Sequence, residues 1–151
     1  MKRRRKGQII KNDMKIIDNT LINKVVEEAK ASPRLRMNYN FHQSLEDKCH
    51  RFLNALEMGT QVAVHHHVTK DETFVLLRGK VRVTTYHDDG SVWESVVLSQ
   101  EEGRIGVDIP KNTWHGVECL ESGSVIFEVK EGPFVTHEVD GILEIKNKYR
   151  K

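Results

Sequence analysis

The sequence predicts a mainly-β domain, either a sandwich or a small barrel, that is preceded by one short helix. Short apolar or alternating runs bounded by turn residues follow one another through most of the chain, which is typical of such folds. The runs cover residues 36–42, 51–58, 61–67, 73–78, 80–86, 91–98, 106–109, 114–120 and 125–130. Turns between them are indicated by Asp88-Asp89-Gly90, Glu102-Gly103 and Ser122-Gly123.

One amphipathic helix is predicted over residues 20–31. Asp18, Asn19 and Thr20 are all residue types that are favoured at a helix N-cap. Apolar side chains then recur at helical spacing on one face, namely Leu21, Ile22, Val25, Val26 and Ala29. Pro33 ends the pattern, because the residue before a proline avoids helical backbone angles.

The most informative motif contains two histidines and a carboxylate in the spacing G-x5-H-x-H-x4-E-x6-G. His65 and His67 alternate along a predicted strand, so both point to the same face, whereas His66 points away. Glu72 follows a short turn, and the interval to the second glycine favours it over Asp71 as the carboxylate. His115 lies 48 residues beyond His67 and is a fourth candidate ligand.

Three imidazoles and one carboxylate suit one divalent ion such as Zn, Fe, Mn or Ni. An octahedral ion held by four protein ligands keeps two positions for water or substrate. The sequence therefore predicts a metal site at His65, His67, Glu72 and His115.

The first motif resembles the first signature of the cupin superfamily, and Pro110-x-Asn112-x-x-His115 resembles the second. Asn112 replaces the usual glycine, Arg104 stands where the second motif would open with glycine, and Cys119 stands where asparagine often closes it. The resemblance implies a double-stranded β-helix, or jelly-roll barrel, and it carries the family's metal ligands onto the same four residues.

A wider resemblance links the chain to the WbuC-type cupin-fold metalloproteins of bacterial O-antigen and capsule gene clusters. It is carried by residues 31–42, 53–57 and 127–133 and runs from about Met14 to Phe134. It implies an enzyme that acts on a sugar or sugar derivative in polysaccharide synthesis, with the metal as a Lewis acid. A non-catalytic binding or sensor module and a non-haem iron oxygenase are the alternatives.

A second set of polar residues alternates with Met37, Tyr39 and Phe41, namely Arg36, Asn38, Asn40 and His42. These side chains form either the solvent face of an edge strand or a surface that binds carboxylate, phosphate or sugar hydroxyls. We favour the binding surface, and His42 is the best candidate for a catalytic base by its ordinary pKa.

Asn54 shares a strand face with Phe52, Leu56 and Met58. A buried amide in an apolar row should be hydrogen-bonded. Asn54 therefore has three possible roles: it hydrogen-bonds a metal ligand, it binds the substrate, or it is a structural polar group. Elsewhere, Trp93 and Trp114 are expected to pack in the core, and His50, His87 and His137 are expected at the surface.

Three segments are expected: a basic leader over residues 1–13, a single cupin domain over 14–134 and a C-terminal extension over 135–151. A chain of 151 residues is long enough to bury one hydrophobic core without stabilisation by disulfides or structural metals. Residues 1–13 hold six basic side chains and one acidic one, so their charge of +5 leaves −3 for the rest of a chain whose total is +2. Because the basic charge is confined to the leader, no nucleic-acid partner is expected.

Neither a membrane-length apolar run nor a secretory signal is present, so a cytoplasmic protein with no membrane partner is expected. Cys49 and Cys119 lack C-x-x-C spacing and are interpreted as reduced, partly buried thiols. Apolar side chains on both faces of residues 74–77 suggest a strand covered twice, and the cupin resemblance implies pairing, so a homodimer is expected. The WbuC-type resemblance implies a small, sugar-derived ligand.

Overall fold

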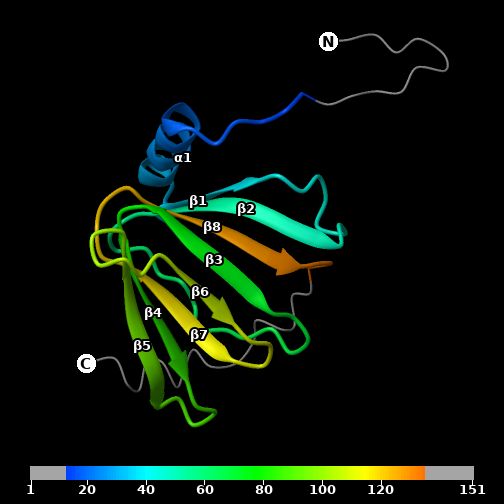
Figure 1. Cartoon of the computed structure of the whole chain (residues 1–151), viewed down its shortest axis with the longest axis vertical. Coiled ribbons are helices and arrows are strands. Elements are labelled where there is room, and N and C mark those ends of the chain that lie inside the picture. Colours follow the sequence, from blue (N-terminus) through cyan, green and yellow to red (C-terminus); the bar gives the residue numbers. More distant parts are fainter. Residues whose placement is uncertain (1–12, 135–151) are drawn as a thin grey trace, which may run out of the picture.

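The computed structural model describes residues 13–134, which form one helix and two antiparallel sheets (Figure 1). The elements are α1 (Asn19–Ala31), β1 (Arg36–Asn40), β2 (Cys49–Leu56), β3 (Glu72–Arg78), β4 (Lys80–Tyr86), β5 (Val92–Ser99), β6 (Gly106–Ile109), β7 (Trp114–Cys119) and β8 (Ser124–Glu131). The predicted leader up to residue 12 and the predicted C-terminal extension lie outside the described residues.

A five-stranded sheet in the order β1-β2-β8-β3-β6 faces a three-stranded sheet in the order β5-β4-β7. All pairings between named strands are antiparallel, and β8 pairs with both β2 and β3, so strands far apart in sequence lie side by side. This is the jelly-roll arrangement of a cupin domain, and the mainly-β fold predicted from the sequence is confirmed.

The prediction of a strand over residues 61–67 is wrong, because these residues do not form a regular strand. In this stretch only His65 makes a β-bridge, and its partner is His115. The two residues exchange backbone hydrogen bonds of 3.0 and 2.8 Å, and the Asn112 amide donates to the His67 carbonyl at 2.7 Å. The ladder cannot continue because the chain opposite His67 is a turn in which Asn112 has a φ of 60°. Asn112 thus adopts the left-handed conformation that asparagine tolerates, as expected for the residue that replaces glycine.

Two apolar clusters cover the two faces of the five-stranded sheet. The cluster between the sheets contains Leu56, Phe74, Leu76, Val81, Val83, Leu98, Ile109, Cys119 and Ile126. The cluster beneath α1 contains Ile22, Val25, Val26, Ala29, Leu53, Ala55 and Val125. Because side chains alternate along β2, Leu53 and Ala55 pack under the helix while Phe52, Asn54 and Leu56 face the interior of the barrel.

Helix α1 begins one residue before the predicted start and ends at the predicted residue. Asp18 is its N-cap, and the Asp18 Oδ1 atom accepts a hydrogen bond from the Leu21 amide at 3.0 Å. Ser32 caps the other end with extended backbone angles immediately before Pro33. No helix among residues 13–134 has the length and hydropathy needed to cross a membrane.

We expect Asp18→Ala to lower the free energy of unfolding by about 1 kcal/mol, because one amide of the first helical turn loses its acceptor. Urea denaturation monitored by circular dichroism measures this loss. Asp18→Asn is the matched control, since asparagine keeps a side-chain oxygen at the cap. Equal losses for the two variants would show that the cap hydrogen bond is not the cause.

Candidate metal centre and adjoining cavity

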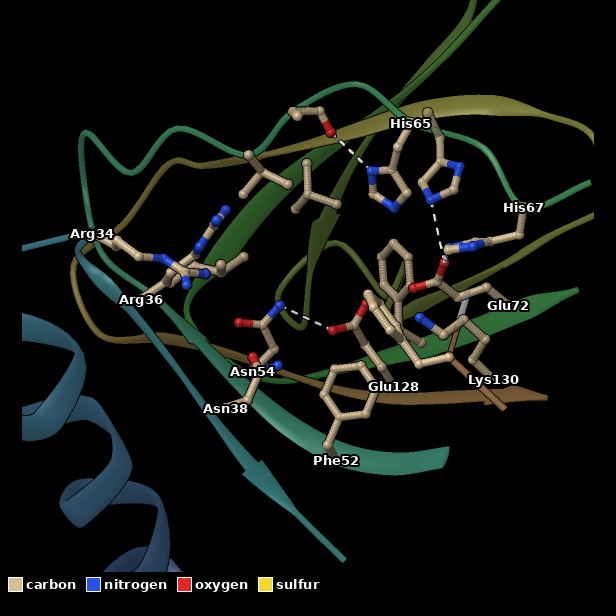
Figure 2. A pocket seen from close by; sticks show the side chains of 17 residues that line it. Arg34, Arg36, Asn38, Phe52, Asn54, His65, His67, Glu72, Glu128 and Lys130 are labelled. Atoms are coloured by element: carbon tan, nitrogen blue, oxygen red, sulfur yellow. Dashed lines mark hydrogen bonds and ion pairs between the residues drawn. The ribbon is translucent and has the colours of Figure 1, made fainter. Parts of the chain in front are cut away.

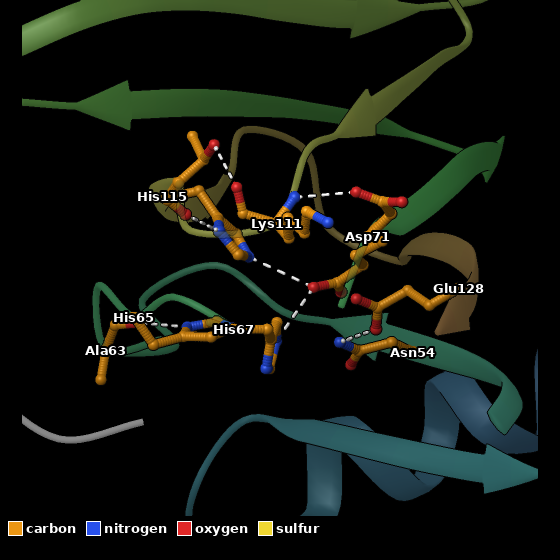
Figure 3. A network of polar contacts seen from close by, with 10 residues as sticks. Asn54, Ala63, His65, His67, Asp71, Lys111, His115 and Glu128 are labelled. Atoms are coloured by element: carbon orange, nitrogen blue, oxygen red, sulfur yellow. Dashed lines mark hydrogen bonds and ion pairs between the residues drawn. The ribbon is translucent and has the colours of Figure 1, made fainter. Parts of the chain in front are cut away.

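Four side chains converge inside the barrel, namely those of His65, His67, Glu72 and His115 (Figures 2 and 3). Each offers one ligand atom, and these four atoms lie within 4.8 Å of one another. His65 is half-buried and the other three are buried. The structure therefore brings together all four residues that the motif spacing predicts, and this group could hold a metal ion.

Three separate parts of the fold supply these side chains. His65 and His67 lie on the irregular stretch between β2 and β3, Glu72 is the first residue of β3, and His115 is the second residue of β7. The bridge between His65 and His115 fixes the distance between the two ligand-bearing segments. Asp71, the competing carboxylate, instead accepts a hydrogen bond from the Lys111 amide at 2.8 Å and holds the turn before His115 (Figure 3).

Backbone carbonyls orient two of the imidazoles. The His65 Nδ1 atom lies 2.8 Å from the Ala63 carbonyl, and the His115 Nδ1 atom lies 2.9 Å from the Thr113 carbonyl. A carbonyl oxygen can only accept, so each Nδ1 carries a proton, and in the neutral imidazole Nε2 then presents a lone pair. Carbonyl hydrogen bonds of this kind commonly set the tautomer of metal-binding histidines.

The Nε2 atom of His115 faces a carboxylate oxygen in the buried interior. His115 Nε2 lies 3.3 Å from Glu72 Oε2, and His67 Nε2 lies 3.2 Å from the same oxygen. Neither His115 Nε2 nor Glu72 Oε2 makes a well-formed hydrogen bond, although both atoms are buried. When the imidazole is neutral, these atoms are acceptors that converge on one point, as the ligand atoms of a metal ion do, so the donor set fits a divalent ion.

The surroundings hold these groups in the protonation states that bind metals. Burial, together with the neighbouring His115, lowers the pKa of His65 to about 4, so this imidazole is neutral near pH 7. Burial alone would raise the pKa of Glu72, but the facing His115 and His67 side chains outweigh it and lower this pKa well below its ordinary value. The site thus offers a carboxylate and a neutral imidazole.

Glu128 is a buried carboxyl group beside Glu72 that the sequence reasoning did not select. Burial and the adjacent Glu72 charge raise the pKa of Glu128 well above its ordinary value, which favours its neutral form. The Asn54 Nδ2 atom donates to Glu128 Oε2 at 2.9 Å (Figure 3). Asn54 therefore supports a neighbour of Glu72 rather than one of the four candidate ligands themselves. Glu128 could have been noticed as an acidic residue sharing a strand face with buried Ile126.

A cavity of about 390 Å³ extends from the four candidate ligands toward the start of β1. Phe52, Asn54, Glu128 and Lys130 line it from β2 and β8. Figure 2 shows Arg34 and Arg36 on the side opposite His67 and Glu72, with Asn54 between the two groups. The cavity thus has a candidate metal end and a guanidinium end.

The second predicted set of polar residues is divided by the structure. Arg36 and Asn38 line the cavity, whereas Asn40 and His42 do not. Asn40 is exposed, and β1 ends there, so the alternation does not extend to residue 42. The buried His42 ring stacks on His50 with centroids 4.2 Å apart, and its Nδ1 atom accepts from the Arg51 amide at 3.1 Å. His42 therefore lies outside the cavity, in contact with His50 and the Arg51 backbone.

Three side chains outside the cavity differ from expectation. His50 is buried instead of lying at the surface, because it packs beneath His42 and its Nε2 atom lies 3.0 Å from the Leu45 carbonyl. Trp93 is 67% exposed and stacks on His87, so it is not a core residue. Cys49 is exposed, whereas Cys119 is buried and both are free thiols.

The fold and the converging donors define a cupin domain with a candidate metal site. The chain belongs to the family described as a domain of unknown function, DUF6016, which matches residues 17–98. No curated protein shows significant sequence similarity to it.

Solved structures of cupin-fold proteins share the architecture. TT1209 from Thermus thermophilus has a TM-score of 0.57 and 21% identity, covering 78% of this chain and 97% of that one. KdgF from Halomonas sp. has a TM-score of 0.53 and 17% identity, with coverages of 70% and 86%. The capsular polysaccharide assembling protein CapF from Staphylococcus aureus has a TM-score of 0.54 and 22% identity, with coverages of 72% and 31%. The chain therefore spans less than a third of CapF, and these similarities show a shared fold.

Proposed function

We propose that this chain is a metal-dependent enzyme that acts on a sugar or sugar derivative in the synthesis of surface polysaccharides such as O-antigen or capsule. The sequence resemblance to WbuC-type proteins supplies this setting, and CapF, which shares the fold, is itself described as a capsular polysaccharide assembling protein. The chemistry of the cavity supports a metal ion and a polar small-molecule ligand independently of either name.

One observation gives the main support for a bound metal ion. His115 Nε2 and Glu72 Oε2 lie 3.3 Å apart, and both atoms are buried and make no well-formed hydrogen bond. His65, His67, Glu72 and His115 would hold one divalent ion, Zn, Fe, Mn or Ni. When bound, such an ion supplies a Lewis acid for a carbonyl or hydroxyl oxygen.

The remaining walls of the cavity suit a polar small molecule. Its volume of about 390 Å³ lies in the range of small-molecule sites. Arg36, Asn38 and Asn54 offer donors and acceptors, while Phe52 and Phe74 supply apolar contact. This mixture is suited to a ligand with several oxygen atoms on a carbon skeleton.

The proposal is tested with protein purified without added metal, after elemental analysis has identified the bound ion. We expect NMR to detect conversion of at least one member of a panel of aldoses, ketoses and nucleotide sugars, and chelation to abolish that conversion. His65→Ala/His67→Ala protein is the matched inactive control. Tight binding without conversion would favour a non-catalytic binding module, and consumption of dioxygen during turnover would favour an oxygenase.

A further inference from the structure

We infer that the ligand of this cavity is a hydroxylated anion, in which a hydroxyl-bearing carbon chain ends in a carboxylate or phosphate held by Arg34 and Arg36. The inference rests on the proposed function, because it concerns the same cavity, and it narrows the class of ligand. Three features of the cavity wall carry it: the guanidinium end, the Asn54 oxygen and the order of the groups along the cavity.

The guanidinium end carries positive charge that no carboxylate among the described residues neutralises. Arg34 and Arg36 both line the cavity, and among residues 13–134 neither pairs with a carboxylate. Arg36 Nη1 donates to the Gln61 carbonyl at 3.0 Å, which holds the side chain in place, while its buried Nε atom has no hydrogen-bond partner. A guanidinium with free donors matches the oxygens of a carboxylate or phosphate.

The Asn54 side chain requires a ligand group that can donate a hydrogen bond, which a carboxylate cannot do. Its Nδ2 atom is committed to Glu128 at 2.9 Å, so its Oδ1 atom is left as an acceptor. This oxygen is buried and has no hydrogen-bond partner. Since a carboxylate can only accept, the anionic end of a ligand cannot satisfy it. A hydroxyl group can, because it donates to Asn54 and still accepts from another group.

The order of these groups along the cavity defines the ligand. Figure 2 shows Asn54 between the arginines on one side and Glu72 with His67 on the other. A neutral sugar would leave the arginines without a counter-charge, and a simple carboxylic acid would leave the Asn54 oxygen unpaired. A hydroxy acid or a sugar phosphate satisfies both and still has an oxygen to face the four candidate ligands.

The test compares probes of equal chain length by isothermal titration calorimetry on the metal-loaded protein. Gluconate and galactonate carry both groups, glucitol and galactitol lack the anion, and hexanoate lacks the hydroxyls. We expect the better aldonate to bind at least ten-fold more tightly than any of the other three probes. Glucitol 6-phosphate is the probe that carries a phosphate instead of a carboxylate. Comparing its affinity with the affinities of the aldonates identifies the preferred anion.

Arg36→Gln should weaken aldonate or sugar-phosphate binding by about ten- to a hundred-fold, as expected when a charged hydrogen-bonding partner is lost. Polyol binding should not change. Arg82→Gln is the matched control, because Arg82 lies outside the cavity and pairs with Glu118 at the surface. Melting curves and elemental analysis of each variant verify folding and metal content.

Equal affinities for polyols and anions, an unchanged affinity in Arg36→Gln, or no binding by any probe would overturn the inference. These outcomes differ from failure of the proposed function. A protein that holds metal and converts a neutral sugar would retain that function while contradicting the anion site, whereas a protein that holds no metal would contradict the function itself.

Discussion

Replacing His65 and His67 together with alanine is expected to abolish metal binding and to leave the domain folded. The double variant removes two of four converging ligands, and such a loss weakens metal affinity by several orders of magnitude. Neither histidine belongs to the two apolar clusters that hold the sheets and the helix together. Elemental analysis measures the metal, and circular dichroism with thermal melting measures the fold.

The matched control is His66→Ala, which removes the middle histidine of the same motif. His66 packs against Trp114 with a tilted ring and is not one of the four converging side chains. This variant should keep a full complement of metal. Stoichiometric metal in His65→Ala/His67→Ala would show that the ion binds elsewhere, and loss of metal in the control would show that the motif tolerates no change.

Gly79→Ala is expected to lower the free energy of unfolding by about 3 kcal/mol or more, a large loss for the addition of one methyl group. Gly79 joins β3 to β4 with a φ of 84°, which is unfavourable for alanine. A Cβ atom would also overlap Ser124 Oγ and lie 2.7 Å from Ser124 Cα. Because Cα belongs to the backbone of β8, no change of rotamer can relieve the second contact.

Gly103→Ala separates the clash from the backbone strain. Gly103 has a φ of 71° and open space where its Cβ would lie, so the expected loss is only about 1 kcal/mol. Urea denaturation of the two variants beside the parent protein gives both free energies of unfolding. Similar losses of unfolding free energy at the two positions would mean that β8 moves to accommodate the methyl group. The close approach of Gly79 to Ser124 would then not destabilise the alanine variant as expected.

Local patterns were sufficient to predict much of this structure. The α1 boundaries follow from the cap at Asp18, the apolar spacing and Pro33, which all lie within about four helical turns of one another. The grouping of His65, His67 and Glu72 follows from alternation and a short turn. His115 was selected through its resemblance to a second motif, because no local rule relates residues so far apart.

Groups that depend on long-range pairing could not be predicted in this way. Glu128 meets Asn54 across a separation of 74 residues, and its pKa is raised by burial and by Glu72 on another strand. The alternation from residue 36 onward was correct for Arg36 and Asn38, but it could not show that β1 ends at Asn40 and that His42 turns toward His50. The WbuC-type assignment, the homodimer and the cytoplasmic location stay predictions.

The irregular stretch between β2 and β3 has a consequence for how the protein responds to loss of its ion. Residues 57–71 carry two of the four candidate ligands, yet their only β-bridge in the described chain is the one between His65 and His115. Segments with few ladder hydrogen bonds open at a lower free energy than the sheets that flank them. An ion bound there would act as a cross-link between this stretch and β7. Its departure should therefore register first as faster amide exchange and easier proteolytic cleavage within these residues, while the helix-covered sheet keeps its protection.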